Sequence, residues 1–549
     1  MVEALATQEF PETLAPAGSQ GAIARAPTGV TAFVGRALKG PVDEPCVIES
    51  FAEYQRVFGG LWQPSTLSYA VEQFFENGGR RAIVVRVANG GRPPTITLPA
   101  AGGGALTLLG LAPGTREHLR ASVDYDGIPE TEDDRFNLVL QRLGGAVPGH
   151  ASGLVEEQEI HRRVSVLPES TRYVRDVLAQ SRLARVAGEV PATRPERPPS
   201  AAPGGVVGYR AANNDGDDGL PLTDYDVIGS AQHGTGLFAL ARGPAFALLC
   251  IPPLSRDQDL GASSLLVAAR VCREHHALLV VDPPRDWHTP VEALAGLRAW
   301  PFRADNAVMY FPRIFAPDRL RGREMLFAAG GAVAGMLARL DETAPPWSPA
   351  DRDGVLLRPR FRPACAVDDA QRARLLQAGV NALASIRIAH REPGSARTLA
   401  TGNLVATDWR YLAPRRLALC VAQSLVAGTR WMLLAHNGER SWQRARAQVE
   451  AFLQSFADEG AFPADEGQPE YFVVCDARIN DEAARAEGRV SLLYGYAAAR
   501  PGEYHAFMVT HRTGGSQVRN VTVNRLATSS RRVEEEIETA LLRGLVGPA

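Results

Sequence analysis

The stretch FALLCIPP, from Phe246 to Pro253, is the first of three short apolar runs that decide the fold. The second run is ALLVV, from Ala277 to Val281, and the third is AVMYF, from Ala307 to Phe311. Between these runs, residues 260–275 and 290–299 carry apolar side chains at helical spacing. Short apolar runs that alternate with helices are typical of buried parallel strands. The pattern therefore predicts a doubly wound parallel sheet in an α/β middle domain, which we assign to residues 206–355.

The region before this domain predicts an arm, an α/β segment and an insertion. Residues 1–22 have little apolar periodicity, so we read them as an extended N-terminal arm. Residues 23–90 predict a first α/β segment, and the Gly-rich residues 91–205 predict a small β-containing peripheral insertion that ends in a linker. The expected elements are strands at 29–36, 81–87, 105–111 and 136–143 and helices at 50–58 and 64–76.

The region after the middle domain predicts an α+β domain over residues 356–504, followed by a C-terminal strand and extension over residues 505–549. The expected helices are 368–379, 412–427 and 441–457, and the expected strands are 430–435, 470–475, 489–496 and 504–511. The helix at 441–457 is amphipathic, so we expect one face of it to be buried. That face carries Trp442, Ala445, Val449, Phe452, Leu453 and Phe456.

The composition limits the classes of function. The chain of 549 residues is 45% hydrophobic and 22% charged, as in ordinary multidomain globular proteins. The 59 Lys and Arg residues against 61 Asp and Glu give a net charge of -2, which offers no general attraction to nucleic acid or to an anionic membrane. The six cysteines are far apart, with no CxxC pair, so we expect buried free thiols. We find no secretory signal and no long apolar span, and we expect no membrane insertion.

A nucleotide enzyme is the obvious rival for a doubly wound sheet, because such sheets bind ligands at the carboxyl ends of their strands. The sequence lacks the phosphate-binding motif GxxxxGK[ST]. The string from Gly234 to Ala239 has glycines at the right spacing, but it precedes a strand instead of linking a strand to a helix. The first strand of the sheet ends in Pro252 and Pro253, where glycines would be needed to approach a pyrophosphate.

Metal and hydrolase sites are equally poorly supported. The acidic run from Asn213 to Gly219 departs from the calcium-loop pattern and is better explained as a solvated turn. His275 and His276 are adjacent, so they point apart on a helix instead of forming a metal-binding face. Asp282 and His288 lack a GxSxG serine that would complete a hydrolase triad. We therefore expect no catalytic residue, no metal and no cofactor.

Several segments together resemble the contractile tail sheath proteins of phages, R-type bacteriocins and extracellular injection systems. The N-terminal part of the resemblance is GVTAFVGRALKGP (29–41), IESFAEYQRVFGGLW (48–62) and SYAVEQFFENGGRRAIVVRV (68–87). It continues through residues 214–219 with Asp224 and Tyr225, LLCIPP (248–253), VDPP (281–284), SARTL (395–399), DWRYLAPRR (408–416) and residues 428–431. The matching segments occur in the family's order. Two regions depart from the family: Phe10 to Leu14 stands where a short Pro-Gly-Val-Tyr-Val-like strand is usual, and Arg512 to Ala549 extends past the expected last strand.

The resemblance implies a mechanism in which terminal arms exchange strands with neighbouring subunits. It implies that the C-terminal domain faces an inner tube and that the insertion faces outward. The stronger candidate for an exchanged strand is the C-terminal one, and its residues are Tyr504, His505, Phe507, Val509 and His511. The weaker candidate is the N-terminal one, at Ile23 and Arg25. The candidates for contact with the inner tube are Arg444 and Arg446.

The resemblance also implies partners and a location. The expected partners are further copies of the chain, with or without sheath paralogues, the inner tube protein, and baseplate and tail-terminator proteins. The expected place of assembly is the bacterial cytoplasm, in a phage tail or in a particle that is released from the cell. Arg531 to Val546 predicts a charged amphipathic helix that is dispensable or that binds another tail component.

Two other classes of function remain open at this point. A nucleotide- or sugar-binding α/β enzyme needs a ligand loop on the sheet of residues 246–311. A static capsid-like structural protein polymerises but forms no tube that shortens. The kind of contractile particle, and the choice between a main sheath subunit and a minor paralogue, are also open.

Overall fold

The computed structural model describes residues 21–144, 154–199, 208–213, 215–347, 357–383, 396–400, 407–463, 470–498, 500 and 503–521. The expected N-terminal arm up to residue 20, the Pro501–Gly502 break and the expected helix at 531–546 lie outside these residues. The chain forms two compact units, which we call the central unit (Pro27–Leu419) and the terminal unit (Met1–Ala26 with Cys420–Ala549). Within the described residues, no helix combines the length and the apolarity that crossing a membrane requires.

The central unit is built on a seven-stranded sheet, in which all neighbouring strands are parallel except β2, which is antiparallel to β3. The predicted parallel sheet is therefore confirmed. The strands lie in the order β17 (Asn381–Ala382), β13 (Ala307–Phe311), β12 (Leu278–Val281), β11 (Leu248–Cys250), β1 (Thr31–Gly35), β3 (Ala82–Arg86) and β2 (Cys46–Ile48).

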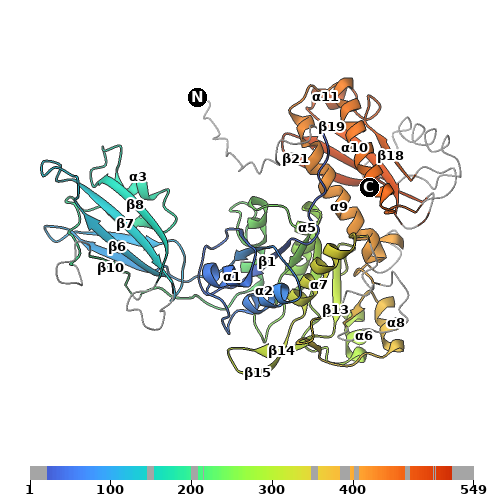
Figure 1. Cartoon of the computed structure of the whole chain (residues 1–549), viewed down its shortest axis with the longest axis horizontal. Helices are drawn as coiled ribbons and strands as arrows, with labels where there is room; N and C mark the ends of the chain where they lie inside the picture. Colours follow the sequence, from blue (N-terminus) through green and yellow to red (C-terminus); the bar gives the residue numbers. More distant parts are fainter. Residues whose placement is uncertain are drawn as a thin grey trace. The chain divides into compact units, whose positions relative to one another are not determined.

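Both faces of this sheet are covered by helices (Figure 1), because successive strand residues point to opposite faces and both sets are apolar. Phe33 belongs to one hydrophobic core and Val34 to the other. The first core contains residues of α1 (Phe51–Phe58), α2 (Thr66–Glu76) and α7 (Gly330–Thr343). The second contains residues of α4 (Asp224–Ile228), η1 (Gly236–Arg242), α5 (Ala262–Glu274) and α6 (Pro290–Ala299).

The central unit continues past the expected boundary at residue 356. Strand β17 pairs with β13, with Asn381 opposite Tyr310, and α8 (Asp369–Gln377) packs Leu375 into the second core. A separate three-stranded sheet consists of β15 (Arg323–Phe327), β14 (Ile314–Asp318) and β16 (Arg362–Pro363). The two units divide inside helix α9 (Leu412–Thr429), after the 3-10 helix η2 (Thr407–Arg410).

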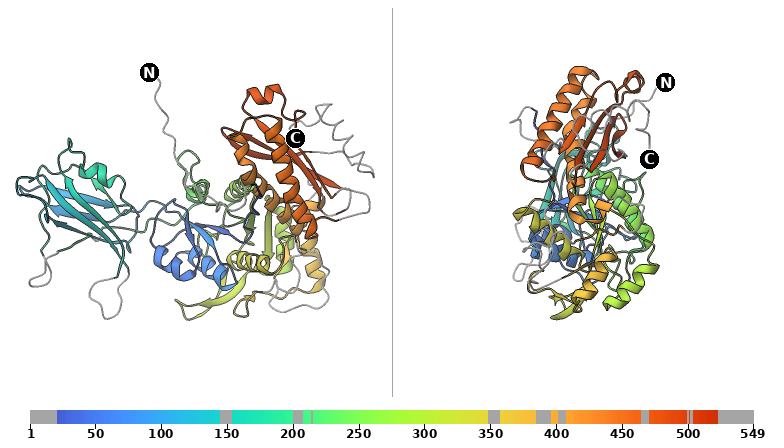
Figure 2. Two further views of the ribbon diagram at one scale, coloured as in Figure 1. Left: turned by 45° about the horizontal axis from the view of Figure 1, so that its top comes forward. Right: turned by 90° about the vertical axis from the view of Figure 1, so that its right-hand side faces the viewer.

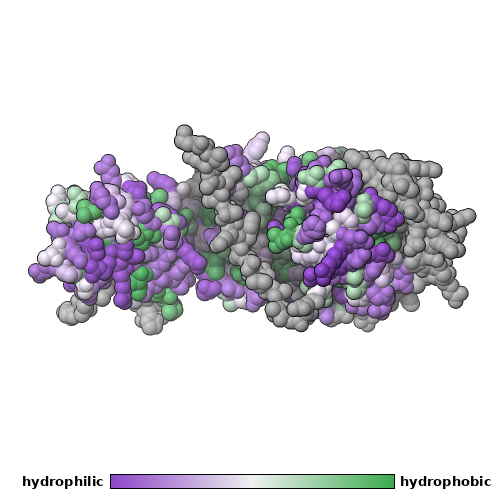
Figure 3. Space-filling view, turned by 90° about the horizontal axis from the view of Figure 1, so that it is seen from above, coloured by the Kyte–Doolittle hydropathy of each residue, from purple (hydrophilic) through white to green (hydrophobic). Residues whose placement is uncertain are grey.

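The insertion consists of two antiparallel sheets around a core of its own, which includes Leu108, Phe136 and Leu138. On the face shown in Figure 3, hydrophilic side chains dominate the surface of the insertion, at the left of the view. Strand β10 pairs with β6, so the insertion reaches past residue 205. The first sheet contains β4 (Thr95–Pro99), β5 (Ala105–Gly110) and β9 (Ala184–Ala187). The second contains β10 (Arg210–Ala211), β6 (His118–Asp124), β7 (Arg135–Leu143) and β8 (Val155–Ser165), and one short helix, α3, spans Val174–Leu178.

The terminal unit places helices against one face of a four-stranded antiparallel sheet (Figure 2). The six apolar residues predicted for one face of α10 are all buried, which confirms that prediction. The predicted strand at 430–435 is wrong, because residues 430–433 form the 3-10 helix η3. The elements are α9, η3 (Arg430–Leu433), α10 (Glu439–Asp458), β18 (Tyr471–Val474), α11 (Glu482–Ala486), β19 (Val490–Ala497), β20 (Tyr504–Arg512) and β21 (Gly515–Val521).

Candidate assembly sites

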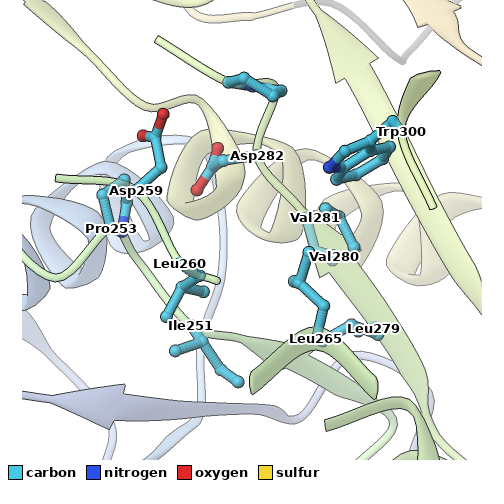
Figure 4. Close-up of a pocket in the computed structure, with 11 residues that line it drawn as sticks. Ile251, Pro253, Asp259, Leu260, Leu265, Leu279, Val280, Val281, Asp282 and Trp300 are labelled. Atoms are coloured by element: carbon cyan, nitrogen blue, oxygen red, sulfur yellow. The ribbon is translucent and has the colours of Figure 1, made fainter. Parts of the chain in front are cut away.

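The carboxyl edge of the central sheet is the place where a doubly wound enzyme would bind its ligand. Figure 4 shows the carboxyl groups of Asp259 and Asp282 at the same end of a pocket there, with Ile251 and Leu265 below them. The Arg313 guanidinium forms an ion pair with Asp259, and Asp282 Oδ1 accepts a hydrogen bond of 2.7 Å from the Gly330 amide. Burial raises the pKa of Asp282 to about 6. These groups are held by neighbours in the fold, and we find no phosphate-binding loop beside them in the described residues.

The acidic run at Asp215 to Asp218 fastens the base of the insertion. The Asp215 carboxylate accepts a hydrogen bond of 2.9 Å from the Thr95 amide, Asp217 pairs with Arg92 at 2.8 Å, and Asp218 accepts a hydrogen bond of 2.8 Å from the Thr115 amide. Each carboxylate has its own partner, as expected for a structural turn. Among the described residues, no three His, Cys, Asp or Glu side chains gather as a metal site would require.

The two adjacent histidines and the cysteines are likewise part of the packing. The ring of His275 stacks on Phe246 with centroids 5.0 Å apart, and burial lowers the pKa of His276 to about 4. All six cysteines are free thiols, which confirms that prediction in part: four are buried, whereas Cys46 and Cys365 are half-buried.

Ile23 and Arg25, the weaker candidates for an exchanged strand, lie in the segment 21–26, which we call the N-terminal anchor. The Arg25 guanidinium makes two hydrogen bonds to the Glu459 carboxylate, at 2.9 and 3.1 Å, and lies 4.2 Å from the centroid of the Phe456 ring. The Ala26 amide donates a hydrogen bond of 2.8 Å to Ser424 Oγ on α9. The anchor is not a strand in this chain, since it binds the chain's own α9 and the end of α10.

Close contact between the anchor and α9 depends on a glycine. A Cβ atom at position 428 would lie 2.5 Å from Ile23 Cγ2, far inside normal carbon contact, so only glycine admits the Ile23 side chain there. Sequence reasoning missed this role, because an isolated Gly within a helical pattern carries no sign of what packs on it.

The C-terminal candidate strand lies inside the sheet of its own unit. Residues 504–512 form β20, which pairs with β19 along one side, Tyr494 opposite Phe507, and with β21 along the other, Val509 opposite Val518. Both hydrogen-bonding edges of β20 are therefore occupied within this chain, and the exchange of this strand with a neighbour stays a prediction. The alternating pattern of residues 504–511 suits an internal strand as well as an exchanged one, so periodicity alone did not separate the two cases.

The side chains of β20 hold the terminal unit together. The Phe507 ring stacks on Tyr494 with centroids 5.3 Å apart, and Val509 is fully buried. His511 is also buried, with Nε2 2.8 Å from Thr429 Oγ1 and Nδ1 2.7 Å from Ser516 Oγ. Burial lowers the pKa of His511 to about 4. Tyr504 and His505, at the start of the strand, are half-buried.

Arg444 and Arg446, the tube-contact candidates, are both exposed on α10. The Arg444 guanidinium lies 4.6 Å from the centroid of the Trp431 ring, and Arg446 Nε pairs with Glu450 at 2.7 Å. Both charged side chains are thus exposed and are held by neighbours on the surface of the terminal unit.

Comparison with known proteins gives similarity in structure but not in sequence. No protein-family model matches the sequence, and no curated protein matches it. The structure is similar to a sheath tail protein from Listeria innocua, with a TM-score of 0.54 and 11% identity over 89% of this chain and 96% of that one. It is also similar to the sheath of an extracellular contractile injection system, PVC, in its contracted state, with a TM-score of 0.50 and 15% identity over 92% of this chain and 96% of that one. The chain therefore has the fold of the contractile tail sheath proteins.

Proposed function

We propose that this chain is the subunit of a contractile tail sheath, which polymerises helically around an inner tube and shortens to drive the tube through a target envelope. The observation that carries the proposal is the likeness to two sheath proteins along about nine-tenths of this chain and nearly all of theirs. The sheath relatives are structural proteins, and we propose a structural role without catalysis here. Contraction then consists of compact units that repack between two lattices while flexible links keep the subunits joined.

The terminal unit supplies the surfaces for strand exchange in this proposal. Among the described residues, strands β18 and β21 are the outer strands of this sheet, and we propose that the outer edge of each can take a strand from a neighbour. Each backbone hydrogen bond added there contributes on the order of 0.5–1.5 kcal/mol. The N-terminal anchor is the root of an arm formed by residues 1–20, which replaces Ile23 and Arg25 as the candidate for the exchanged N-terminal strand.

The inner tube is the proposed partner of α10. A contact that must release when the particle fires is expected to be polar and modest in area, because a large dry interface would hold tube and sheath together. Arg444 and Arg446 present positive charge on the outer face of the helix. Charge reversal of both is expected to reduce co-assembly with the tube and to spare self-assembly, and unchanged co-assembly would remove α10 from the contact.

The remaining partners and the location rest on the same proposal. Baseplate and tail-terminator proteins would bind the two ends of the polymer. Assembly would take place in the bacterial cytoplasm, before the phage tail or injection particle is released. A minor paralogue would occupy only a short stretch of such a polymer.

Negative-stain microscopy of the purified chain, alone and with its inner-tube protein, tests the proposal. We expect hollow helical tubes of two kinds, an extended one and a contracted one, which differ in the axial length of tube per subunit. The extended kind should form only around the inner tube. Monomers under all conditions would refute the proposal, and tubes of a single fixed geometry would favour a static structural protein. A large thermal shift with one member of a nucleotide or sugar panel would favour the enzyme alternative.

A chain that begins at Gly21 tests the arm separately. This chain keeps the anchor contacts of Arg25 and Ala26 but lacks residues 1–20. We expect a melting temperature close to that of the full chain together with the loss of long tubes. Tubes of normal length would show that the arm is not exchanged.

A further inference from the structure

The two faces of the terminal sheet are covered unequally by the described residues. On one face, the rings of Tyr494 and Phe507 stack with Tyr496, and Phe462 joins Tyr496 to Phe456 in the apolar stripe of α10. On the other face, Leu493 and Ala506 are buried, but the apolar side chains around them are only half-buried. These half-buried side chains are Phe472, Ile479, Tyr504, Met508 and Val521, and we call them the open-face cluster.

The last described residue of the sheet belongs to this same face. Val521, the last residue of β21, lies opposite Ala506 and belongs to the open-face cluster. Two pairs further along, Arg519 lies opposite Met508, and because alternate residues share a face, its guanidinium belongs to the same side of the sheet. Arg519 is exposed. The open face therefore combines apolar side chains with a positive charge at the strand from which the chain exits.

The sequence that follows has the complementary pattern. Val533, Ile537 and Leu541 recur at helical spacing within residues 531–546, with Ala540 and Gly544 on the same side. Three glutamates, at positions 534, 536 and 538, flank this apolar stripe at helical spacing. The intervening residues 522–530 reach about 30 Å when extended, whereas the four-stranded sheet is about 15–20 Å wide. The segment is thus long enough to reach across the sheet from the end of β21.

We propose that residues 531–546 dock as an amphipathic helix on the open face of the sheet β18–β21 of their own chain. The stripe of Val533, Ile537 and Leu541 covers the open-face cluster, and the glutamates lie near Arg519. A tethered segment binds with an effective concentration in the millimolar range, which favours it over a partner free in solution. The sheet then lies between two helical layers.

The rate at which hydroxyl radicals oxidise Met508 in the full-length soluble chain measures whether the helix covers this side chain. The test variant is Ile537→Asp, which puts a charge into the apolar stripe, and the matched control is Thr539→Asp, which puts the same charge on the opposite side of the same helix. Leu541→Asp serves as a second, independent test. We expect Met508 to be oxidised at least about fivefold faster in both test variants than in the wild type or the control. The buried Met432 is the internal reference, and its rate should not change.

If something other than residues 531–546 covers the open face, the oxidation experiment gives a different result. Equal Met508 oxidation in all four proteins overturns the proposal and leaves the face to another tail component. Protection that is lost on dilution of the wild type overturns it in favour of a second copy of the chain. A rise in the Met432 rate together with the Met508 rate identifies a variant that has lost its fold, and the conclusion then rests on the other test variant.

Discussion

Replacement of Gly428 by alanine separates the stability of helix α9 from the attachment of the N-terminal anchor. The added Cβ would lie 2.5 Å from Cγ2 and 3.1 Å from Cβ of Ile23, whereas carbon atoms in contact are about 3.5–4.0 Å apart. The clash involves atoms at the base of the Ile23 side chain, so the anchor backbone must move. The helix itself gains, because alanine is about 1 kcal/mol more favourable than glycine in a helix.

The magnitude follows from the contacts that fix the anchor. The half-exposed pair of Arg25 and Glu459 contributes about 0.2–1 kcal/mol, and the contact of Arg25 with the Phe456 ring contributes about 0.5–1 kcal/mol. The hydrogen bond from Ala26 to Ser424 adds about 0.5–1.5 kcal/mol. An overpacked site costs about 1–3 kcal/mol, which is similar to the sum of these contacts. The anchor should therefore detach in a large fraction of molecules while α9 remains folded.

Limited trypsin digestion measures this detachment, because trypsin cleaves after Arg25 only when the anchor is free. Cleavage from a rapidly opening state follows the open population, so a loss of 1.4 kcal/mol speeds it about tenfold. We expect that increase in Gly428→Ala, with no fall in the melting temperature. The double variant Gly428→Ala with Ile23→Ala removes the clashing Cγ atoms and should restore slow cleavage. An unchanged rate in Gly428→Ala, or no rescue in the double variant, would refute this account of the anchor.

Three further predictions concern the cores of the two units. Gly335→Ala in α7 should destabilise the central unit by about 1–3 kcal/mol in urea unfolding, because its Cβ would lie 2.3 Å from the carbonyl oxygen of Phe74; a stabilised variant would contradict this close approach. The pKa of Asp282 is raised to about 6 in the folded chain. The protonated carboxyl group therefore contributes to the free energy of unfolding fully below about pH 4, and this contribution is lost as the pH rises through 6. Relative to the wild type, Asp282→Asn should therefore gain about 2–3 kcal/mol in unfolding free energy between pH 4 and 7, and parallel pH profiles would argue against the shift. Phe507→Ala should cost about 3–5 kcal/mol and abolish the calorimetric transition of the terminal unit, since its ring stacks on Tyr494; an unaltered transition would show that β20 is dispensable.

The central sheet was predictable because its sequence signal is local. The runs at Leu248–Cys250, Leu278–Val281 and Ala307–Phe311 are apolar on both faces, and a strand buried on both faces leaves few alternatives. Residues 430–435 show the limit of the same reasoning. A run of five apolar residues, 431–435, fits a strand or a helical turn, and the helix that precedes it favours the turn.

The assembly sites were less predictable, because their meaning depends on residues far away in the sequence. Arg25 is explained by Glu459 and Phe456, and no pattern near residue 25 indicates either partner. The strand character of 504–511 was read correctly, but the hairpin formed with Gly515–Val521 was not foreseen, although it occupies the second edge of β20. Whether an edge of a strand is free for a partner depends on which other strands of the folded chain pair with it, and the local sequence does not contain this information.

The terminal unit is made from both ends of the described chain, with the anchor at Gly21–Ala26 bound to residues of α9 and to the end of α10, all of which follow Leu419 in the sequence. During synthesis the anchor leaves the ribosome early and its binding site leaves late, after the whole central unit has emerged. A nascent chain therefore carries a folded central unit while its terminal unit is still incomplete. If polymerisation needs the terminal unit, only completed polypeptides can add to a filament. Nascent chains on neighbouring ribosomes of one mRNA would then not polymerise with one another.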